Sequence, residues 1–206
     1  MPIKNIIFDF GDVFINLDKN FVYDQMNGSE AGKSDKKLQL HELNKQFEVG
    51  SINSDTFLSG LSQVYPKKTK TEIKNIFNGM LLDFPAYRLE FLKELSQRGT
   101  YKLFLLSNTN ELHINNGREV IGEKMYHEFK NCFEQFYLSH ELGLRKPDAA
   151  IFNHVMKQNQ LEANETLFID DTLENIQAAD GMGIHTWHLL EQEDVVELES
   201  KLDQHK

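Results

Sequence analysis

The sequence has little cysteine, no excess of positive charge and no long apolar run, and each of these absences excludes a class of protein. Its only cysteine is Cys132, so no disulfide can form within the chain, which fits a reducing compartment. Acidic residues outnumber basic ones by 32 to 22, and the formal net charge of −10 argues against nucleic acid or an anionic membrane as the main partner. No stretch approaches the ~20 apolar residues of a membrane-spanning helix.

What is present is the composition of an ordinary globular protein. Apolar residues make up 40% and charged residues 26% of the 206 residues, enough for one α/β domain or a core domain with a small insert. The N-terminus lacks a signal-peptide pattern, because Asp9 interrupts the first apolar run early. We therefore expect a cytoplasmic protein. Its oligomeric state is left open between a monomer and a homodimer.

The apolar residues 6–8 predict a short strand that is buried on both faces, as in a parallel sheet. The run ends in Asp9, and Gly11 and Asp12 follow. Ligands of open α/β sheets bind beyond the carboxyl ends of the strands, so a carboxylate at this position is placed for chemistry. The alternative is an ordinary polar turn, because Asp and Gly are common in turns.

Residues 18–83 show helical patterns without a buried strand, and we interpret them as a small helical insert after the first strand. Ser54 or Asp55 is placed to cap one of its helices, and Thr71 to cap another. From Pro85 onward the pattern changes, and helices alternate with strands predicted at residues 101–106, 133–138, 166–169 and 184–190.

This alternation predicts an α/β fold of the Rossmann-like type, a doubly wound parallel sheet with helices on both faces. The helical insert should hang over the end of the sheet that carries Asp9. Polar residues follow the strand ends or lie in loops beside them; they are Asp9, Ser107, Asn108, Lys146, Asp170 and Asp171. Each alone could be a turn, a helix cap or a surface lysine. In a doubly wound sheet these loops converge on one crevice, so the ordered set points to a shared site.

The chemistry of these groups favours phosphoryl transfer. A carboxylate can attack phosphorus only if the repulsion between two anions is removed. A divalent cation held by Asp9 and Asp171, helped by Asp170, would remove it and polarise the phosphoryl oxygen. Mg²⁺ suits this position because it prefers hard oxygen ligands and takes one from a substrate phosphate. Lys146 adds a second positive charge, and Ser107 Oγ with nearby backbone N–H groups can bind phosphate oxygens.

The same positions resemble the four motifs of the haloacid dehalogenase-like hydrolase superfamily, over nearly the whole chain. The segments that carry the resemblance are residues 8–13 (FDFGDV), 105–108 (LLSN), 143–148 (GLRKPD) and 168–175 (FIDDTLEN). The resemblance implies a core domain of residues 1–17 and 84–206 and a C1-type cap domain of residues 18–83.

The resemblance also implies a role for each site residue. Asp9 would be the nucleophile that becomes an aspartyl-phosphate. The phosphoryl group would be bound by Ser107, Asn108 and Lys146. The ligands of Mg²⁺ would be Asp9, the backbone carbonyl of Gly11 and Asp171, with Asp170 in support.

One position departs from the family pattern. Most phosphatases of the family have a second Asp two residues after the nucleophile as general acid and base; here that residue is Gly11, and the nearest acid is Asp12. Such help is worth ~10²–10⁴ in rate, and its loss matters least with a good leaving group, such as the anomeric oxygen of a sugar 1-phosphate. A branch acting on glucose 1-phosphate and the phosphatase domain of epoxide hydrolases look similar around this motif. We therefore expect a small phosphorylated metabolite, with sugar phosphates as candidates, and proton transfer by substrate, water or Asp12.

Two other functions remain open. A 2-haloacid dehalogenase would use Asp9 to attack carbon without a metal and would need an arginine in the cap. The first arginines, Arg88 and Arg98, lie outside the insert, and the paired acids at 170 and 171 favour a metal. The third possibility is a catalytically weak protein that binds a phosphorylated ligand or a partner protein, because Gly11 replaces the usual acid.

Overall fold

A parallel sheet of five strands forms the centre of the computed structural model, which describes residues 2–27 and 33–203. The strands are β1 (Asn5–Phe8), β2 (Lys102–Ser107), β3 (Gln135–Leu138), β4 (Thr166–Asp170) and β5 (His185–His188). Their spatial order is β3-β2-β1-β4-β5, so the chain leaves β1 in one direction and later returns to its other side. This reversal is the switch point of a doubly wound sheet, and the predicted fold class is confirmed. The fifth strand is shorter than predicted.

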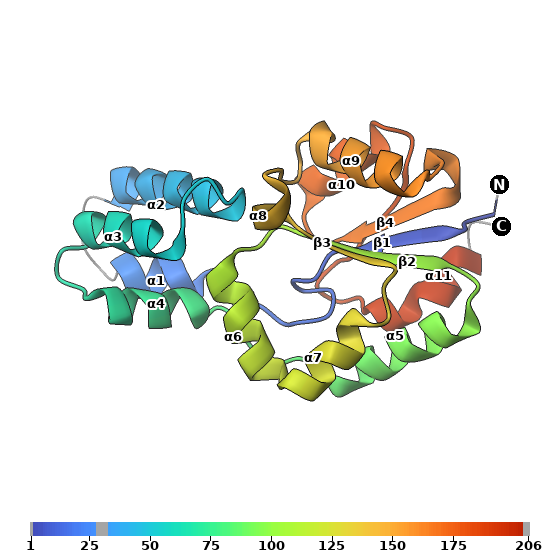
Figure 1. Ribbon diagram of the computed structural model, residues 1–206, viewed down its shortest axis with the longest axis horizontal. Coiled ribbons are helices and arrows are strands. Elements are labelled where there is room, and N and C mark those ends of the chain that lie inside the picture. Colours follow the sequence, from blue (N-terminus) through green and yellow to red (C-terminus); the bar gives the residue numbers. More distant parts are fainter. Residues whose placement is uncertain (1, 28–32, 204–206) are drawn as a thin grey trace.

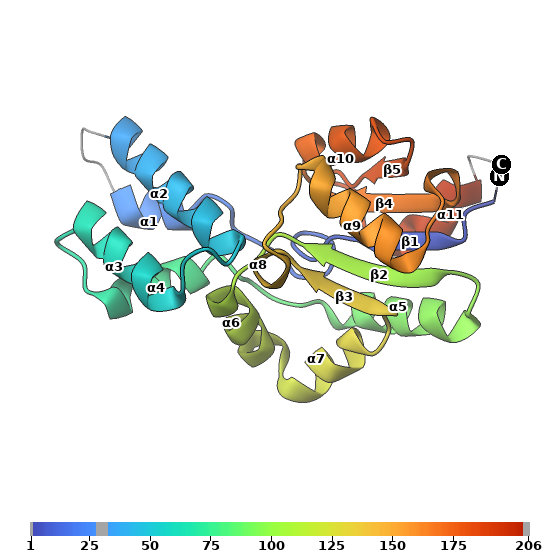
Figure 2. The ribbon, with the colours of Figure 1, turned by 45° about the horizontal axis from the view of Figure 1, so that its top comes forward.

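Side chains alternate between two apolar layers along each strand. Ile6 and Phe8 of β1 pack in the layer that contains residues of α5 (Ala86–Arg98), α7 (Glu123–Lys130) and α11 (Leu198–Asp203). Ile7 packs in the opposite layer, with α9 (Ala149–Asn159) and α10 (Leu173–Asp180). Figures 1 and 2 show the two groups of helices on opposite faces of the sheet. Because both faces are covered, the central strands β1, β2 and β4 carry apolar side chains at successive positions rather than alternating apolar and polar ones.

In the part of the chain that the structure describes, four helices lie beyond the carboxyl ends of the strands, at the left of Figure 1. They are α1 (Phe21–Asn27), α2 (Lys33–Glu48), α3 (Ser54–Val64) and α4 (Lys70–Asn78), all within the predicted insert. They share an apolar cluster of their own, in which the rings of Phe47 and Phe57 stack with centroids 4.4 Å apart. Leu112 of α6 (Glu111–Ile121) joins this cluster, so the core also contributes a side chain to it.

Two of these helices start earlier than predicted. Asn53 caps α3 in place of Ser54 or Asp55, since its side chain accepts a hydrogen bond from the backbone N–H of Thr56 (2.9 Å). Thr69 caps α4 in place of Thr71, because it forms a reciprocal capping box with a glutamate three residues on. Gly99 ends α5 as its C-cap, with φ of 63° in the left-handed region that favours glycine. Among the described residues, no helix combines the length and apolar character needed to span a membrane.

Candidate active site

The central strands bring the predicted site residues to one edge of the sheet. Asp9 follows β1, Ser107 ends β2, and Asp170 ends β4 with Asp171 directly after it. The backbone N–H of Asp9 donates to the carbonyl oxygen of Ile169 (2.9 Å), which extends the pairing of β1 with β4 by one residue. This bond fixes Asp9 beside the end of β4, and the three acidic residues gather there as the sequence predicted.

Lys146 enters the same crevice from the loop between α8 (Ser139–Leu142) and α9. Its side chain is 1% exposed, and Nζ lies 2.8 Å from Asp9 Oδ1 and 2.6 Å from Asp170 Oδ2. Burial lowers the pKa of Lys146, but attraction to the two carboxylates outweighs it, so its pKa lies above the usual value. The ammonium therefore keeps its charge between β1 and β4.

Asp170 is fully buried, and hydrogen bonds occupy both of its carboxylate oxygens. Oδ1 accepts from the backbone N–H of Thr172 (2.8 Å) and from Asn175 Nδ2 (3.1 Å). Oδ2 accepts from Lys146 Nζ (2.6 Å) and from the same Asn175 nitrogen (3.0 Å). These contacts orient the carboxylate towards Lys146 and fasten it to the first turn of α10.

The carboxyl group of Asp9 lies in an unfavourable place for an anion. Burial raises the pKa of Asp9 to about 7; attraction by Lys146 opposes this, and repulsion from Asp170 and Asp171 adds to it. Although Lys146 Nζ is close to Asp9 Oδ1, it approaches outside hydrogen-bond geometry, so this buried oxygen has an ion pair but no hydrogen bond. One oxygen from each of the three acids lies within 4.8 Å of the others. A divalent cation with a preference for oxygen ligands fits this set.

Lys19 belongs to none of the four sequence motifs, yet its side chain joins two acidic residues. Its ammonium donates to Asp171 Oδ2 and lies 3.0 Å from Asp12 Oδ2. Burial raises the pKa of Asp171 above its usual value, although Lys19 counteracts the shift. Asp12 itself has φ of 53°, and its Oδ1 accepts from the backbone N–H of Leu17 (2.8 Å). The Asp12 carboxylate therefore closes a turn and lines a neighbouring hollow, not the crevice of Asp9.

Ser107 and Asn108 both line the crevice, but their side chains differ in what they contact. Ser107 is buried at the end of β2. The Asn108 amide is bonded at both ends to the backbone of Lys146: Nδ2 donates to its carbonyl oxygen (2.9 Å), and Oδ1 accepts from its N–H (2.8 Å). The Asn108 side chain thus fastens the Lys146 loop to β2, a task that the sequence pattern does not reveal.

Gly11 lies where a side chain has little room. A Cβ at this position would meet Cδ1 of Leu17 at 2.6 Å, closer than carbon atoms normally approach. Leu17 therefore occupies the space into which the usual second acid of the motif would extend. The glycine itself borders the crevice and the adjoining cavity.

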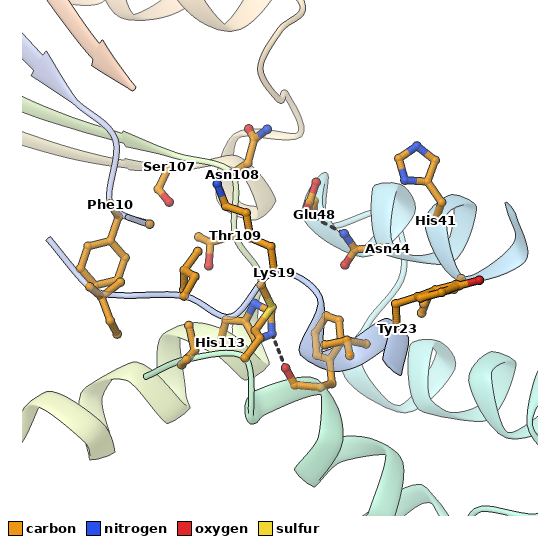
Figure 3. A pocket seen from close by; sticks show the side chains of 18 of the residues that line it. Phe10, Lys19, Tyr23, His41, Asn44, Glu48, Ser107, Asn108, Thr109 and His113 are labelled. Carbon is orange, nitrogen blue, oxygen red and sulfur yellow. Dashed lines mark hydrogen bonds between the residues drawn. The ribbon is translucent and has the colours of Figure 1, made fainter. Parts of the chain in front are cut away.

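A cavity of about 290 Å³ adjoins the crevice, between the sheet edge and the helices of the insert. Figure 3 shows Ser107 and Asn108 on the core side and His41, Asn44 and Glu48 on α2 across from them. A ligand bound at Asp9 would extend from the core towards α2.

Two further contacts join the insert to the core. Glu48 Oε2 accepts from Arg145 Nε (3.0 Å) and lies 2.9 Å from Arg145 Nη2. His113 of α6 contacts the carbonyl oxygen of Phe77 through Nε2 (3.0 Å), and the two rings stack with centroids 4.2 Å apart. Burial lowers the pKa of His113 to about 4, so it is neutral at physiological pH. No local sequence signal indicates these pairs, because the partners are 97 and 36 residues apart.

Comparison with known proteins connects this arrangement to one family of hydrolases. Residues 3–183 match the family model described as haloacid dehalogenase-like hydrolase. The D-ribitol-5-phosphate phosphatase of Bacteroides thetaiotaomicron is 27% identical over 189 residues, which cover 90% of this chain and 91% of that protein. The sesquiterpene phosphatase astK of Aspergillus oryzae is 30% identical, over 90% of this chain and 89% of its own.

Solved structures show the same relation. A HAD family enzyme from Bacteroides thetaiotaomicron, in complex with magnesium and inorganic phosphate, superposes with a TM-score of 0.78 at 31% identity, over 95% of this chain and 98% of that one. A dehalogenase in an intermediate complex has a TM-score of 0.62 at 13% identity, over 93% and 87% of the two chains. At that identity the likeness shows the fold alone.

Proposed function

We propose, because the chain belongs to the haloacid dehalogenase-like hydrolase family, that the protein is a Mg²⁺-dependent phosphatase. It hydrolyses a small phosphorylated metabolite through an aspartyl-phosphate. Two relatives that match almost end to end are phosphatases, and a similar enzyme binds magnesium and phosphate together. The observation that carries the proposal is the buried ammonium of Lys146 between Asp9 and Asp170, beside a third carboxylate.

Asp9 is the proposed nucleophile. One of its oxygens forms a bond to phosphorus while the bond from phosphorus to the ester oxygen breaks, and the electron pair leaves with that oxygen, which takes up a proton. Water then attacks the aspartyl-phosphate, which releases inorganic phosphate and restores the carboxylate. Lys146 lies 2.8 Å from Asp9 and offsets the repulsion between the nucleophile and the substrate, because it is a second positive charge in a buried site.

The residues proposed to hold Mg²⁺ are Asp9, Asp171 and the backbone carbonyl of Gly11. The bound ion would draw the phosphate towards the nucleophile and stabilise the charge on the phosphoryl oxygens. Asp170 supports the site through Lys146, since its oxygens are already bonded to neighbouring donors.

The phosphoryl oxygens are proposed to contact Lys146 Nζ, Ser107 Oγ and backbone N–H groups next to Asn108. The amide of Asn108 contributes indirectly, because both of its ends hold the backbone of Lys146. Ser107 is buried and borders both the crevice and the cavity, so its hydroxyl can meet a phosphate that spans the two.

The proton of the leaving group is proposed to come from water or from the substrate. Asp12 could supply it only by leaving the backbone N–H of Leu17 and the ammonium of Lys19. Without a general acid the site favours a leaving group that is stable as an anion or that carries its own proton donor.

Several coarser assignments complete the proposal. Residues 18–83 form a cap domain over a core domain of residues 1–17 and 84–206. The net charge of −10 opposes nucleic acid as a ligand. A cytoplasmic location is proposed from the single cysteine, Cys132, a buried thiol whose pKa burial raises to about 11. The oligomeric state, a monomer or a homodimer, stays a prediction with both alternatives open.

Turnover of p-nitrophenyl phosphate tests the proposal. We expect activity that requires Mg²⁺, stops with EDTA and is lost in Asp9→Asn, while Asp24→Asn, at an exposed position on α1, keeps it. Chloride release from 2-chloropropionate without metal would instead support the dehalogenase. A folded protein that is inert towards a broad panel of phosphate esters would support a binding protein.

A further inference from the structure

We propose that the face of α2 that lines the cavity selects a polyhydroxylated leaving group, such as a polyol or sugar phosphate, over an alkyl or isoprenyl phosphate. The inference rests on the proposed phosphatase function and names its substrate class. It starts from the contrast between the two walls of the cavity next to Ser107. The wall opposite α2, called the apolar wall below, carries Leu17, Met80 and Leu81 but also polar side chains such as Lys19 and Thr109. The wall formed by α2 presents four polar side chains together with Leu40.

The polar wall is a stripe along α2. Lys37, His41, Asn44 and Glu48 follow one another at intervals of four, three and four residues, and each borders the cavity. Residues spaced in this way share one face of a helix, with Cβ atoms about 5–6 Å apart. The stripe thus presents hydrogen-bonding groups at several points along one line, which matches a ligand with hydroxyl groups along a carbon chain.

The stripe is held in place from the core. Glu48 Oε1 accepts from Asn44 Nδ2 (2.8 Å), and Glu48 Oε2 lies 2.9 Å from Nη2 of Arg145. The side chains of Glu48 and Arg145 are only 14% and 23% exposed. Arg145 precedes Lys146 in the chain, so the contacts run from the phosphate-binding loop to α2. Positions fixed in this way lose little conformational freedom when a ligand binds.

Asn44 is the side chain best placed to form hydrogen bonds with a hydroxyl group of the substrate. Its bond to Glu48 uses one of two N–H groups, and an amide carbonyl can accept from a hydroxyl as well. Figure 3 shows Asn44 on α2 across the cavity from Lys19 and Thr109.

The apolar wall complements such a ligand rather than opposing it. Leu17, Met80 and Leu81 border the cavity and can pack against the C–H groups of a polyol while its hydroxyls face α2. An alkyl chain would fit the apolar wall but would cover the polar stripe without offering partners. Asn44 and Glu48 are half-buried, whereas Lys37 and His41 are exposed, so the stripe favours a hydroxylated ligand mainly through Asn44.

The test compares two phosphate esters of equal chain length, sorbitol 6-phosphate and hexyl phosphate, with kcat/KM measured for each. For the wild-type protein we expect a preference of about 10-fold or more for the polyol, because the side chains of the stripe are half-buried or exposed. Asn44→Leu, which keeps the size of the side chain, should reduce this preference by about 3- to 10-fold. Gln39→Leu is the matched control, since this residue is exposed on α2 and does not border the cavity, and it should keep the preference.

Failure of this inference can be separated from failure of the proposed function by calorimetry with Asp9→Asn and the same two esters. Turnover of p-nitrophenyl phosphate together with an equal or greater preference for hexyl phosphate would overturn the inference and leave the phosphatase intact. So would an unchanged preference in Asn44→Leu. If no ester is turned over but sorbitol 6-phosphate still binds more tightly than hexyl phosphate, and Asn44→Leu removes the difference, the inference holds and the phosphatase function is wrong. Equal binding of the two esters would overturn the inference whether or not the protein is a phosphatase.

Discussion

Replacement of Asp9 by Asn should stabilise the folded protein at alkaline pH while it removes activity. In the folded protein burial raises the pKa of Asp9 from 3.8 to about 7, a value that already includes the attraction of Lys146. Below pH ~4 the carboxyl is protonated in both the folded and unfolded states, so its ionisation costs nothing. Between pH ~4 and ~7 the unfolded state releases the proton first, so the free energy of unfolding falls as the pH rises. Above pH ~7 the carboxyl is ionised in both states, and the whole loss of stability is present.

The size of the effect follows from the shift. About three pKa units at 1.36 kcal/mol each give a ceiling of roughly 4 kcal/mol above pH ~7. Relaxation around the buried amide reduces this, and we expect about 2 kcal/mol, or roughly 4–8 °C in Tm for a chain of this size.

The assay is thermal unfolding in EDTA at pH 5.0 and pH 8.5. Asp9→Asn should exceed the wild type by several degrees at pH 8.5 and by much less at pH 5.0, and Asp24→Asn should show neither change. Added Mg²⁺ should raise the Tm of the wild type at pH 8.5 but not that of Asp9→Asn, because binding to the folded state alone stabilises it. An Asp9→Asn protein that is less stable at pH 8.5, or equally shifted at both pH values, would refute the reasoning.

Three further variants separate the roles of neighbouring residues. Asp12→Asn should keep kcat for p-nitrophenyl phosphate within about two-fold, because this carboxylate closes a turn; a fall of 10²-fold or more would assign it to proton transfer. Asn108→Ala loses two hydrogen bonds to the backbone of Lys146, so it should lower the free energy of unfolding by about 1–3 kcal/mol in urea titrations and raise KM. An unchanged urea midpoint would show that Asn108 does not hold the Lys146 loop. Lys19→Met removes an ammonium from Asp171 and should lower the Mg²⁺ concentration for half-maximal activity by about five-fold or less, and an increase would show that Lys19 does not compete with the ion.

The sheet could be predicted because each central strand is an apolar run bounded by polar residues. Residues 6–8 and 166–169 are buried on both faces and carry no alternation that could be mistaken for a surface strand. Strand ends in a parallel sheet converge, so the order of the motifs already placed Asp9, Lys146 and Asp170 in one group. The N-cap residues of the helices were harder to predict, because Thr69 and Thr71 have the same side chain and only the reciprocal contact with Glu72 selects Thr69.

The rest of the site depends on contacts between distant segments. The bonds of Asn108 to Lys146 and of Glu48 to Arg145 join residues 38 and 97 positions apart, and no periodicity reports such pairs. Lys19 belongs to no motif and meets Asp171 only because the loop after β1 folds back over the strand ends. Asp12 was a plausible acid by its position in the sequence, but its positive φ and its bond to Leu17 direct the carboxylate elsewhere.

The central claim is that Asp9 receives the phosphoryl group beside Lys146 and a divalent cation. The most direct measurement is rapid acid quenching during turnover of a ³²P-labelled phosphate ester with Mg²⁺, followed by peptide mapping of the protein. We expect acid-stable, base-labile label on the peptide that contains Asp9, and none in EDTA or in Asp9→Asn. Label on another residue, or turnover in Asp9→Asn at the wild-type rate, would contradict the claim.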